Sequence, residues 1–497
     1  MKTRLFLIPI YLLSVALFSC SDPLDKIAPG ISSIKSTDLI ETVSQLSDKE
    51  YEGRMSGSKA YDKAAAYMAN KFEDIGMQPG INSSFMQHLN VEYNEIHSPC
   101  LLNLVKDNTV VKKYELGKDY VYRGFTGSGN FTAPVAFCGY GISRPDLGYD
   151  DYAGIDVKGK VVMVFKYNPS WQIGDNRWHH NYPREKSFTA AQHGAIGILF
   201  VSIPNVPEVQ KTIGSILAGE GEQNESFPQM HIDLPVAADL LEGSGFSLSQ
   251  LQTTIDDNKK PKSILVNASV QVEVHAEYTK EKQTENVVAM MEGSDPALKD
   301  QYLVIGAHLD HVGIQGDDVY FPGANDNASG SAAVLEIAKA FKESGVKPKR
   351  SIIFVLFAGE ELGLNGARYF VENSPVPHEK IVAMLNMDCI AHGDSIRIGG
   401  GGKSPRLWNI TREKDSLLSN MMVEGTWPGG GADATPFFEQ NIPTLYFVTT
   451  NSYTHLHYMT DTPETLNPDL YEKIVRLAYA TAYEVAMGNY EKEVIDN

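Results

Sequence analysis

From about residue 284 to the carboxyl terminus, the sequence alternates between short apolar runs and amphipathic segments with helical spacing. The run 351–358 is almost continuously apolar, as is typical of a strand buried on both faces of a sheet. The expected strands are 302–307, 351–358, 381–387 and 444–448, and the expected helices are 329–341 and 471–487. This alternation predicts an α/β fold, a three-layer sandwich around a mostly parallel central sheet.

Histidines and carboxylates stand where these expected strands end. They occur in five motifs, which are Gly306-Ala-His-Leu-Asp310, Gly323-Ala-Asn-Asp-Asn327, Gly359-Glu-Glu-Leu362, Asn386-Met-Asp388 and His457-Tyr-Met-Thr-Asp-Thr462. Ligands of open α/β sheets bind beyond the carboxyl ends of the strands, so we expect these side chains to meet there. Together they supply the imidazole and carboxylate donors that a pair of hydrolytic zinc ions needs.

Each motif alone has an ordinary alternative explanation. Asp326 alone would be a helix N-cap, because Asp, Asn and Ser are all favoured there. His308 and Asp310 alone would be a structural hydrogen bond. Asp388 interrupts an apolar run, and a buried salt bridge would satisfy it as well as a metal ion. Cys389 beside it could be a ligand but is expected to pack as a small apolar residue.

Glu360 and Glu361 are adjacent carboxylates at the end of an expected buried strand. Such neighbours repel each other and are costly without a cation. They can divide the work, with one binding a metal ion while the other carries a proton as a general base. A solvated helix start is the alternative, because glutamate is favourable there, but the apolar run before the pair argues against it.

The amino terminus has the features of an export signal. A short basic start precedes an apolar run, Leu5–Phe18, that is too short to span a bilayer comfortably. The step Ser19-Cys20 at its end resembles a bacterial lipoprotein signal, in which Cys20 becomes the lipidated first residue. An ordinary secretory signal with a chance cysteine is the alternative. We therefore expect an exported protein of the bacterial cell envelope that contacts the membrane through a lipid anchor only.

Composition excludes some partners. The 497-residue chain has 62 acidic and 43 basic residues, a formal net charge of -19, and no basic cluster, so nucleic acid is not an expected partner. Four cysteines are too few for a disulfide scaffold. A bridge between Cys100 and Cys138 is compatible with an oxidising envelope but is not required. The sequence does not determine the oligomeric state.

Residues 120–275 differ from the rest of the chain in the spacing of their apolar runs and turns. Short apolar strands at 135–137, 161–165 and 196–200 are separated by glycine-rich turns, and 187–193 is an expected helix, which together suggest a small β-rich insertion. The expected organisation is a signal peptide at 1–19, a tether at 20–36, a domain with the five metal-binding motifs at 37–119 and 276–490, and the insertion at 120–275.

In their order His, Asp, Glu-Glu, Asp, His, the motifs resemble the di-zinc aminopeptidase family. This family includes the secreted bacterial leucyl-type aminopeptidases and is related to glutaminyl cyclases and glutamate carboxypeptidases. The resemblance runs from about 286 to 467 and also covers 52–57 and 64–79. It implies an exopeptidase that removes amino-terminal residues from peptides by water activated between two zinc ions. Other divalent metals are compatible with such mixed ligands.

The resemblance also assigns the metal ligands. One ion takes His308, Asp326 and Asp388. The other takes Asp326, Glu361 and His457, so that Asp326 bridges the two ions.

Further roles follow from the same resemblance. Glu360 is the general base, and Asp310 accepts the second N–H of the first metal's histidine. The family's last histidine stands four residues before Asp-Thr, which selects His457 over His455. The family usually has tyrosine just before that histidine, where this chain has Leu456, so Tyr453 or His455 is a candidate to stabilise the oxyanion in its place.

The insertion resembles the protease-associated domain of many family members, most clearly at Tyr149-Asp-Asp-Tyr152, Asp156-Val-Lys-Gly-Lys160 and Gly194-Ala-Ile-Gly197. Three other functions remain open. A glutaminyl cyclase is usually described with one zinc ion, whereas all five ligands are present here. A carboxypeptidase needs a cationic clamp. The arginines available for one are Arg368, Arg397, Arg406 and Arg412. An inactive surface binding protein is the third.

Overall fold

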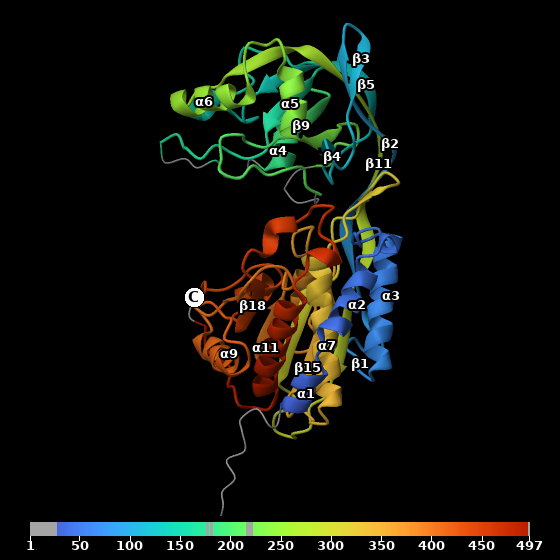
Figure 1. The fold of residues 1–497 in the computed structure, drawn as a ribbon, viewed down its shortest axis with the longest axis vertical. Coiled ribbons are helices and arrows are strands. Elements are labelled where there is room, and N and C mark those ends of the chain that lie inside the picture. Colours follow the sequence, from blue (N-terminus) through green and yellow to red (C-terminus); the bar gives the residue numbers. More distant parts are fainter. Residues whose placement is uncertain (1–26, 175–177, 179–181, 215–221, 496–497) are drawn as a thin grey trace, which may run out of the picture.

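The computed structural model describes residues 27–174, 178, 182–214 and 222–495. The predicted signal peptide and Cys20 lie outside these residues. In Figure 1 the chain forms two lobes connected by two long strands, β2 (Met86–Lys106) and β11 (Ser263–Met291). Within the described ranges, no helix has both the length and the apolar character that a membrane span requires.

The lower lobe in Figure 1 is built around a mostly parallel sheet. Its strands are β12 (Tyr302–His308), β15 (Ser351–Phe357), β16 (Ile381–Met387), β17 (Ile396–Gly399) and β18 (Thr444–Thr449), together with the end of β11. Strand β12 pairs in parallel with β15 and β16, and β16 pairs in parallel with β18. The strands β11 and β17 add antiparallel pairs at the two edges of this part of the sheet. These strands agree with the predicted ones to within one residue at most ends.

Helices cover both faces of this sheet. One face packs against α1 (Ala28–Ser33), α2 (Ser36–Leu46), α3 (Lys59–Asp74), α7 (Ser329–Glu343), α9 (Pro405–Leu418) and α11 (Pro468–Ala486). The other packs against α8 (Asn365–Glu372) and α10 (Ala434–Glu439). Residues of β15 alternate between the two cores, with Phe354 in the first and Val355 in the second. This arrangement confirms the predicted three-layer α/β sandwich.

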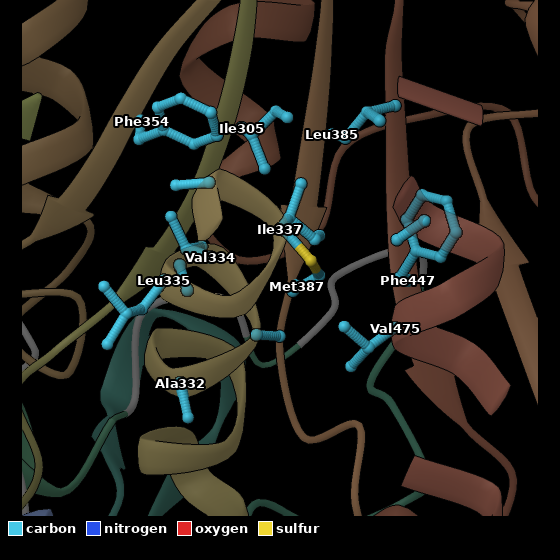
Figure 2. Close-up of a cluster of buried hydrophobic side chains, with 14 of the residues drawn as sticks. Ile305, Ala332, Val334, Leu335, Ile337, Phe354, Leu385, Met387, Phe447 and Val475 are labelled. Carbon is cyan, nitrogen blue, oxygen red and sulfur yellow. The ribbon is translucent and has the colours of Figure 1, made fainter. Parts of the chain in front are cut away.

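Figure 2 shows the larger core. Ile305, Phe354 and Leu385 from three neighbouring strands meet Ile337 of α7, and Val475 of α11 completes the layer. All five are buried. Because burying such a side chain contributes about 1.5–3 kcal/mol, this layer fixes the strand ends that carry the polar motifs.

The upper lobe continues the same sheet through β5 (Gly129–Cys138), β8 (Val161–Phe165), β9 (Gly197–Val201), β10 (Gln229–Ile232) and β4 (Tyr120–Tyr122). It contains the predicted strands. It also contains three helices, α4 (Pro183–Gln192), α5 (Leu234–Leu241) and α6 (Leu248–Asn258), of which the sequence indicated only the first. Cys100, Cys138 and Cys389 are free thiols, so the bridge considered between the first two is not formed.

The remaining elements are short. They are β1 (Gln78–Pro79), β3 (Thr109–Lys113), β6 (Ser143–Arg144), β7 (Tyr149–Asp150), β13 (Ile314–Gln315), β14 (Val319–Tyr320), and the single turns η1 (Lys49–Tyr51), η2 (Pro145–Leu147), η3 (Ala324–Ala328), η4 (His378–Lys380), η5 (Ser452–His455) and η6 (Pro463–Thr465).

The two lobes touch beside the polar motifs. Val121 of β4 packs with Val312 and Phe321 of the lower lobe. The Gln315 amide exchanges two hydrogen bonds of 2.8 Å with the backbone of Tyr122. The upper lobe therefore rests on the loop that follows β12.

Candidate metal centre

The sheet brings the five motifs together. Strands β12, β15 and β16 are neighbours, and their carboxyl ends lead to His308, to Glu360 and to Asp388 respectively. Asp326 comes from the turn η3 that leads into α7, and His457 from the segment after η5. The cluster lies at the carboxyl edge of the parallel strands, as the sequence predicted.

Asp326 lies at the middle of the cluster, and its two carboxylate oxygens face different histidines. Oδ1 is 3.4 Å from His308 Nε2, and Oδ2 is 3.2 Å from His457 Nε2. Ligands that share one zinc ion at about 2.0–2.2 Å lie about 3.3 Å apart. The geometry therefore fits a carboxylate shared between two ions.

One donor group forms on each side of Asp326. On the first side, Asp388 Oδ1 is 3.4 Å from His308 Nε2. On the second side, Glu361 Oε2 is 3.0 Å from His457 Nε2. These imidazole and carboxylate donors suit zinc. His455 is not among them, because it is only partly buried and bonds the Thr460 hydroxyl at 2.9 Å.

His311 also lies in the second group, and the sequence did not predict it. Its Nδ1 lies 2.9 Å from Glu361 Oε1 and 3.6 Å from Asp326 Oδ2, and the side chain is fully buried. His311, Asp326, Glu361 and His457 each offer a donor atom within 4.8 Å of the others. Its place directly after the His-Leu-Asp motif was the only available signal.

The surroundings shift the pKa values of the two adjacent glutamates in opposite directions. Burial raises the pKa of Glu360 well above its ordinary value, and nearby carboxylates add to the effect. Burial acts in the same direction on Glu361, but the charge of His457 and the contacts with both histidines outweigh it and lower the pKa to about 2. Pairs whose pKa values are pushed apart in this way are typical of an acid–base residue beside a charged partner.

Asp310 does not act on His308 in the way predicted. The imidazole Nδ1 lies 3.1 Å from the backbone oxygen of Asp310 and 3.8 Å from its carboxylate. The backbone carbonyl therefore orients the ring, because it is the nearer acceptor. The carboxylate instead accepts the backbone N–H of Glu360 at 3.2 Å, so it positions the proposed base.

Two buried charged groups support the loops around the cluster. Asp461 accepts the backbone N–H groups of Asn325 and Asp326 at 2.9 and 3.0 Å, which fixes the turn that carries the central carboxylate. Arg54 donates to the backbone oxygens of Leu46, Leu309, Pro322 and Gly323. Arg54, in the stretch 52–57, thus connects the loop after β12 with the loop before η3.

Comparison with known proteins agrees with this geometry. Residues 286–482 match the model described as Peptidase family M28. These residues belong to peptidase family M28.

Two of the sequence relatives are larger proteins than this chain. The glutamate carboxypeptidase 2 homolog of Caenorhabditis briggsae is 26% identical over 426 residues, which are 69% of this chain and 52% of the relative. That of Caenorhabditis elegans is 23% identical over 520 residues, 82% of this chain and 62% of the relative. The chain thus spans about half to three-fifths of the length of these relatives.

Solved structures share the fold over nearly the whole chain. An aminopeptidase from Aneurinibacillus sp. strain AM-1 has a TM-score of 0.65 at 20% identity and covers 95% of this chain and 98% of its own. A peptidase M28 precursor from Shewanella amazonensis SB2B has a TM-score of 0.68 at 19% identity, covering 95% and 97%. Both comparisons include the upper lobe.

Two tyrosines extend from the M28 site toward solvent. Tyr446 is buried and donates to Asp388 Oδ2 at 2.9 Å. Its hydroxyl is also 3.1 Å from that of Tyr453, whose side chain is half exposed. Leu456, which replaces the family tyrosine, packs in the apolar cluster around Cys389 and Tyr446. The sequence indicated Tyr453 but not Tyr446, because an apolar strand position gives no polar signal.

Asp433 is a further M28 residue that the sequence analysis missed. It is fully buried, and within the described part of the chain neither carboxylate oxygen has a hydrogen-bond partner. Burial raises its pKa well above the ordinary value, and Asp388 and Glu361 repel its charge. An unpaired buried carboxylate of this kind calls for a proton or a cation.

Proposed function

We propose that this chain is a two-metal aminopeptidase that removes amino-terminal residues from peptides. The observation that carries the proposal is the position of Asp326 between two histidine–carboxylate groups, with one oxygen toward each. When bound, the two ions would polarise the substrate carbonyl and lower the pKa of the attacking water. Zinc fits the donors, and other divalent metals are compatible with them.

The residues around the site have distinct roles in this proposal. His308 and Asp388 hold one ion, Glu361 and His457 hold the other, and Asp326 is shared. Glu360 takes a proton from the attacking water on its carboxylate and returns it to the leaving amine nitrogen. The two bound ions would favour its ionised form, which is the form that accepts the first proton.

The groups at the site suit the amino end of a substrate. Glu360 and Asp433 are carboxyl groups beside the metal ligands that can accept hydrogen bonds from the α-amino group of a peptide. Arg54, the buried cation beneath the site, directs its donors at backbone oxygens and offers no clamp for a carboxylate.

One experiment tests the proposal directly. The purified zinc-loaded protein is incubated with a mixed peptide library, and mass spectrometry shows which end shortens. We expect stepwise loss of amino-terminal residues, no reaction after amino-terminal acetylation, and unchanged reaction after carboxyl-terminal amidation. Conversion of amino-terminal glutamine with loss of ammonia would indicate a cyclase. Two bound ions without turnover would indicate a binding protein.

A carboxypeptidase is the second candidate because of a buried basic pair in the upper lobe. Arg123 and Lys166 are both buried, and burial together with the charge of Arg123 lowers the pKa of Lys166 well below its ordinary value. Among the described residues neither has a carboxylate partner, and a bound substrate carboxylate would restore the charged form of Lys166. Shortening at the carboxyl end of the library peptides would favour a carboxypeptidase.

The four arginines named from the sequence lie apart from one another. Arg368 and Arg406 approach Glu439 and Glu493, and Arg397 and Arg412 lie over tryptophan rings.

We further propose that the upper lobe is a protease-associated domain that restricts access to the site. Its contact with the metal centre supports this proposal, since the backbone N–H of Gly214 donates to the His457 backbone oxygen at 2.7 Å.

We also propose that Cys20 carries a lipid anchor that holds the exported protein to the bacterial cell envelope.

A further inference from the structure

His311 faces the same two carboxylates as the predicted ligand His457. Its Nδ1 lies 2.9 Å from Glu361 and 3.6 Å from Asp326. The corresponding distances from His457 Nε2 are 3.0 and 3.2 Å. The two rings stand edge to face with centroids 5.4 Å apart, so both nitrogens can point at one ion between them without a clash.

We propose that His311 is a direct ligand of the second metal ion, which closes that site with four protein ligands. The proposal rests on the two-metal function proposed above. The first site has three protein ligands, His308, Asp388 and the shared Asp326. Four protein ligands are typical of structural zinc sites, whereas three with a free position are typical of catalytic ones.

The burial of His311 supports ligation over simple hydrogen bonding. The side chain is fully buried between two carboxylates that are also almost fully buried. A neutral imidazole with its proton on Nε2 presents the Nδ1 lone pair to the ion. One added cation at this point would satisfy Glu361, Asp326 and one ring nitrogen of each histidine together, whereas a hydrogen bond from His311 satisfies only one oxygen of Glu361.

The two sites are therefore unequal. The second site, with two imidazoles and two carboxylates, fills first and holds its ion tightly. The first site fills later and exchanges its ion more readily, because it has one imidazole and a free position.

Metal binding distinguishes ligation from hydrogen bonding. The full-length protein is stripped with a chelator and titrated with zinc by calorimetry, with ion counts from native mass spectrometry. We expect one tight and one weaker site. His311→Ala and His311→Gln should each weaken the tight site more than about 100-fold, because loss of a residue that only supports a ligand costs about 10–100-fold. Glutamine can still donate to Glu361 but does not replace the imidazole.

Two controls frame the result. His455→Ala removes a nearby, partly buried histidine outside both donor groups and should leave both zinc affinities unchanged. His308→Ala should weaken only the second, looser binding step. X-ray absorption of the wild-type protein with one equivalent of zinc should count two imidazoles per ion, and this measurement stands even where a variant fails to fold.

Other outcomes have defined meanings. The proposal would be overturned by a His311→Gln variant that keeps the tight zinc affinity. It would also be overturned if X-ray absorption counted a single imidazole on the zinc ion in the tight site. A protein that loads two ions in the expected order but shortens no peptide would contradict the aminopeptidase function and leave the role of His311 intact. A wild-type protein that binds a single ion dependent on His311 would contradict the two-metal function and still support ligation by His311.

Discussion

Glu360 and Glu361 have the same side chain, and their different roles come from their neighbours. Glu361 lies between His311 and His457, which keep its carboxylate ionised. Glu360 has no cationic contact as close among the described side chains, and burial favours its protonated form. The sequence could predict that the pair divides its roles, because adjacent buried carboxylates repel each other. Which residue takes which role depended on the family resemblance.

Replacing Glu360 by glutamine tests its role as a base. We expect Glu360→Gln to keep its zinc content and fold and to lose about 10²–10⁴-fold or more in kcat, because the amide cannot accept a proton. Steady-state kinetics and metal analysis measure the two effects. A variant that loses metal would make Glu360 a ligand, and near-normal turnover would require another base.

The tyrosine pair predicts two separable effects. Tyr453→Phe should lower kcat with little change in KM, by about 10²–10³-fold if its hydroxyl is the only donor to the oxyanion. Tyr446→Phe removes the bond to Asp388 and should instead weaken metal binding about 10–100-fold. Leu456→Tyr should restore part of the activity lost in Tyr453→Phe. An unchanged kcat in that variant would exclude Tyr453 as the donor.

Among single residues, the sequence predicted the site residues that stand in a recognisable motif and did not predict the others. His308 and Asp388 were recognisable because each ends an apolar run, and Asp326 and His457 because the motifs around them have a family spacing. Contacts that depend on chain segments far apart left no such pattern. His311, Tyr446 and Asp433 belong to that class, and so does the replacement of the Asp310 carboxylate by its own backbone carbonyl.

Helix α7 carries a buried acid whose effect on stability depends on pH. Glu336 is 4% exposed, and its nearest cation, Lys339 Nζ, is 3.5 Å away. Burial raises the pKa of Glu336 from 4.5 to about 7. Because the folded-state pKa is the higher one, its stabilising contribution is complete below pH 4.5 and is lost as pH rises through about 7, by up to about 3 kcal/mol.

Glu336→Gln should therefore stabilise the protein at pH 8 and change little at pH 4.5, because glutamine resembles the protonated acid. Thermal unfolding at several pH values measures this as a difference in Tm that grows between pH 4.5 and 7. Asp469→Asn, at an exposed side chain of α11 that pairs with Lys473, is a matched control and should show no such trend. A constant difference in Tm at all pH values would contradict the assignment.

At the scale of elements, the buried strands were the most predictable part. Strands β8 and β16 begin and end where the apolar runs do. The long strands β2 and β11 were not predicted, because polar and exposed residues interrupt their alternation, as in the stretch 279–283 of β11. Their pairing joins segments far apart in sequence, which periodicity alone does not show. The predicted boundary between residues 275 and 276 falls inside β11.

The whole molecule offers a test of the proposed anchor. Cys20→Ala should prevent lipidation, so that the protein leaves the detergent phase and its amino-terminal peptide lacks the added acyl mass. The reason is that the cysteine thiol is the attachment point in a lipoprotein signal. Phase partitioning and peptide mass spectrometry measure the two effects. Cys100→Ala serves as the control, and unchanged partitioning of Cys20→Ala would exclude the anchor.

The β2–β11 ribbon has a consequence for how this molecule can move. One antiparallel ladder runs from Met86 in the lower lobe to Val105 in the upper lobe, with interruptions at Glu273/His275 and at Thr279/Lys282. Hydrogen-bonded ribbons resist stretching but bend where the ladder is interrupted. A bend of the ribbon at these two interruptions would move the upper lobe and break its contacts with the lower one, the Gly214–His457 and Gln315–Tyr122 hydrogen bonds. A movement of the upper lobe away from the site would then also release the segment that carries His457.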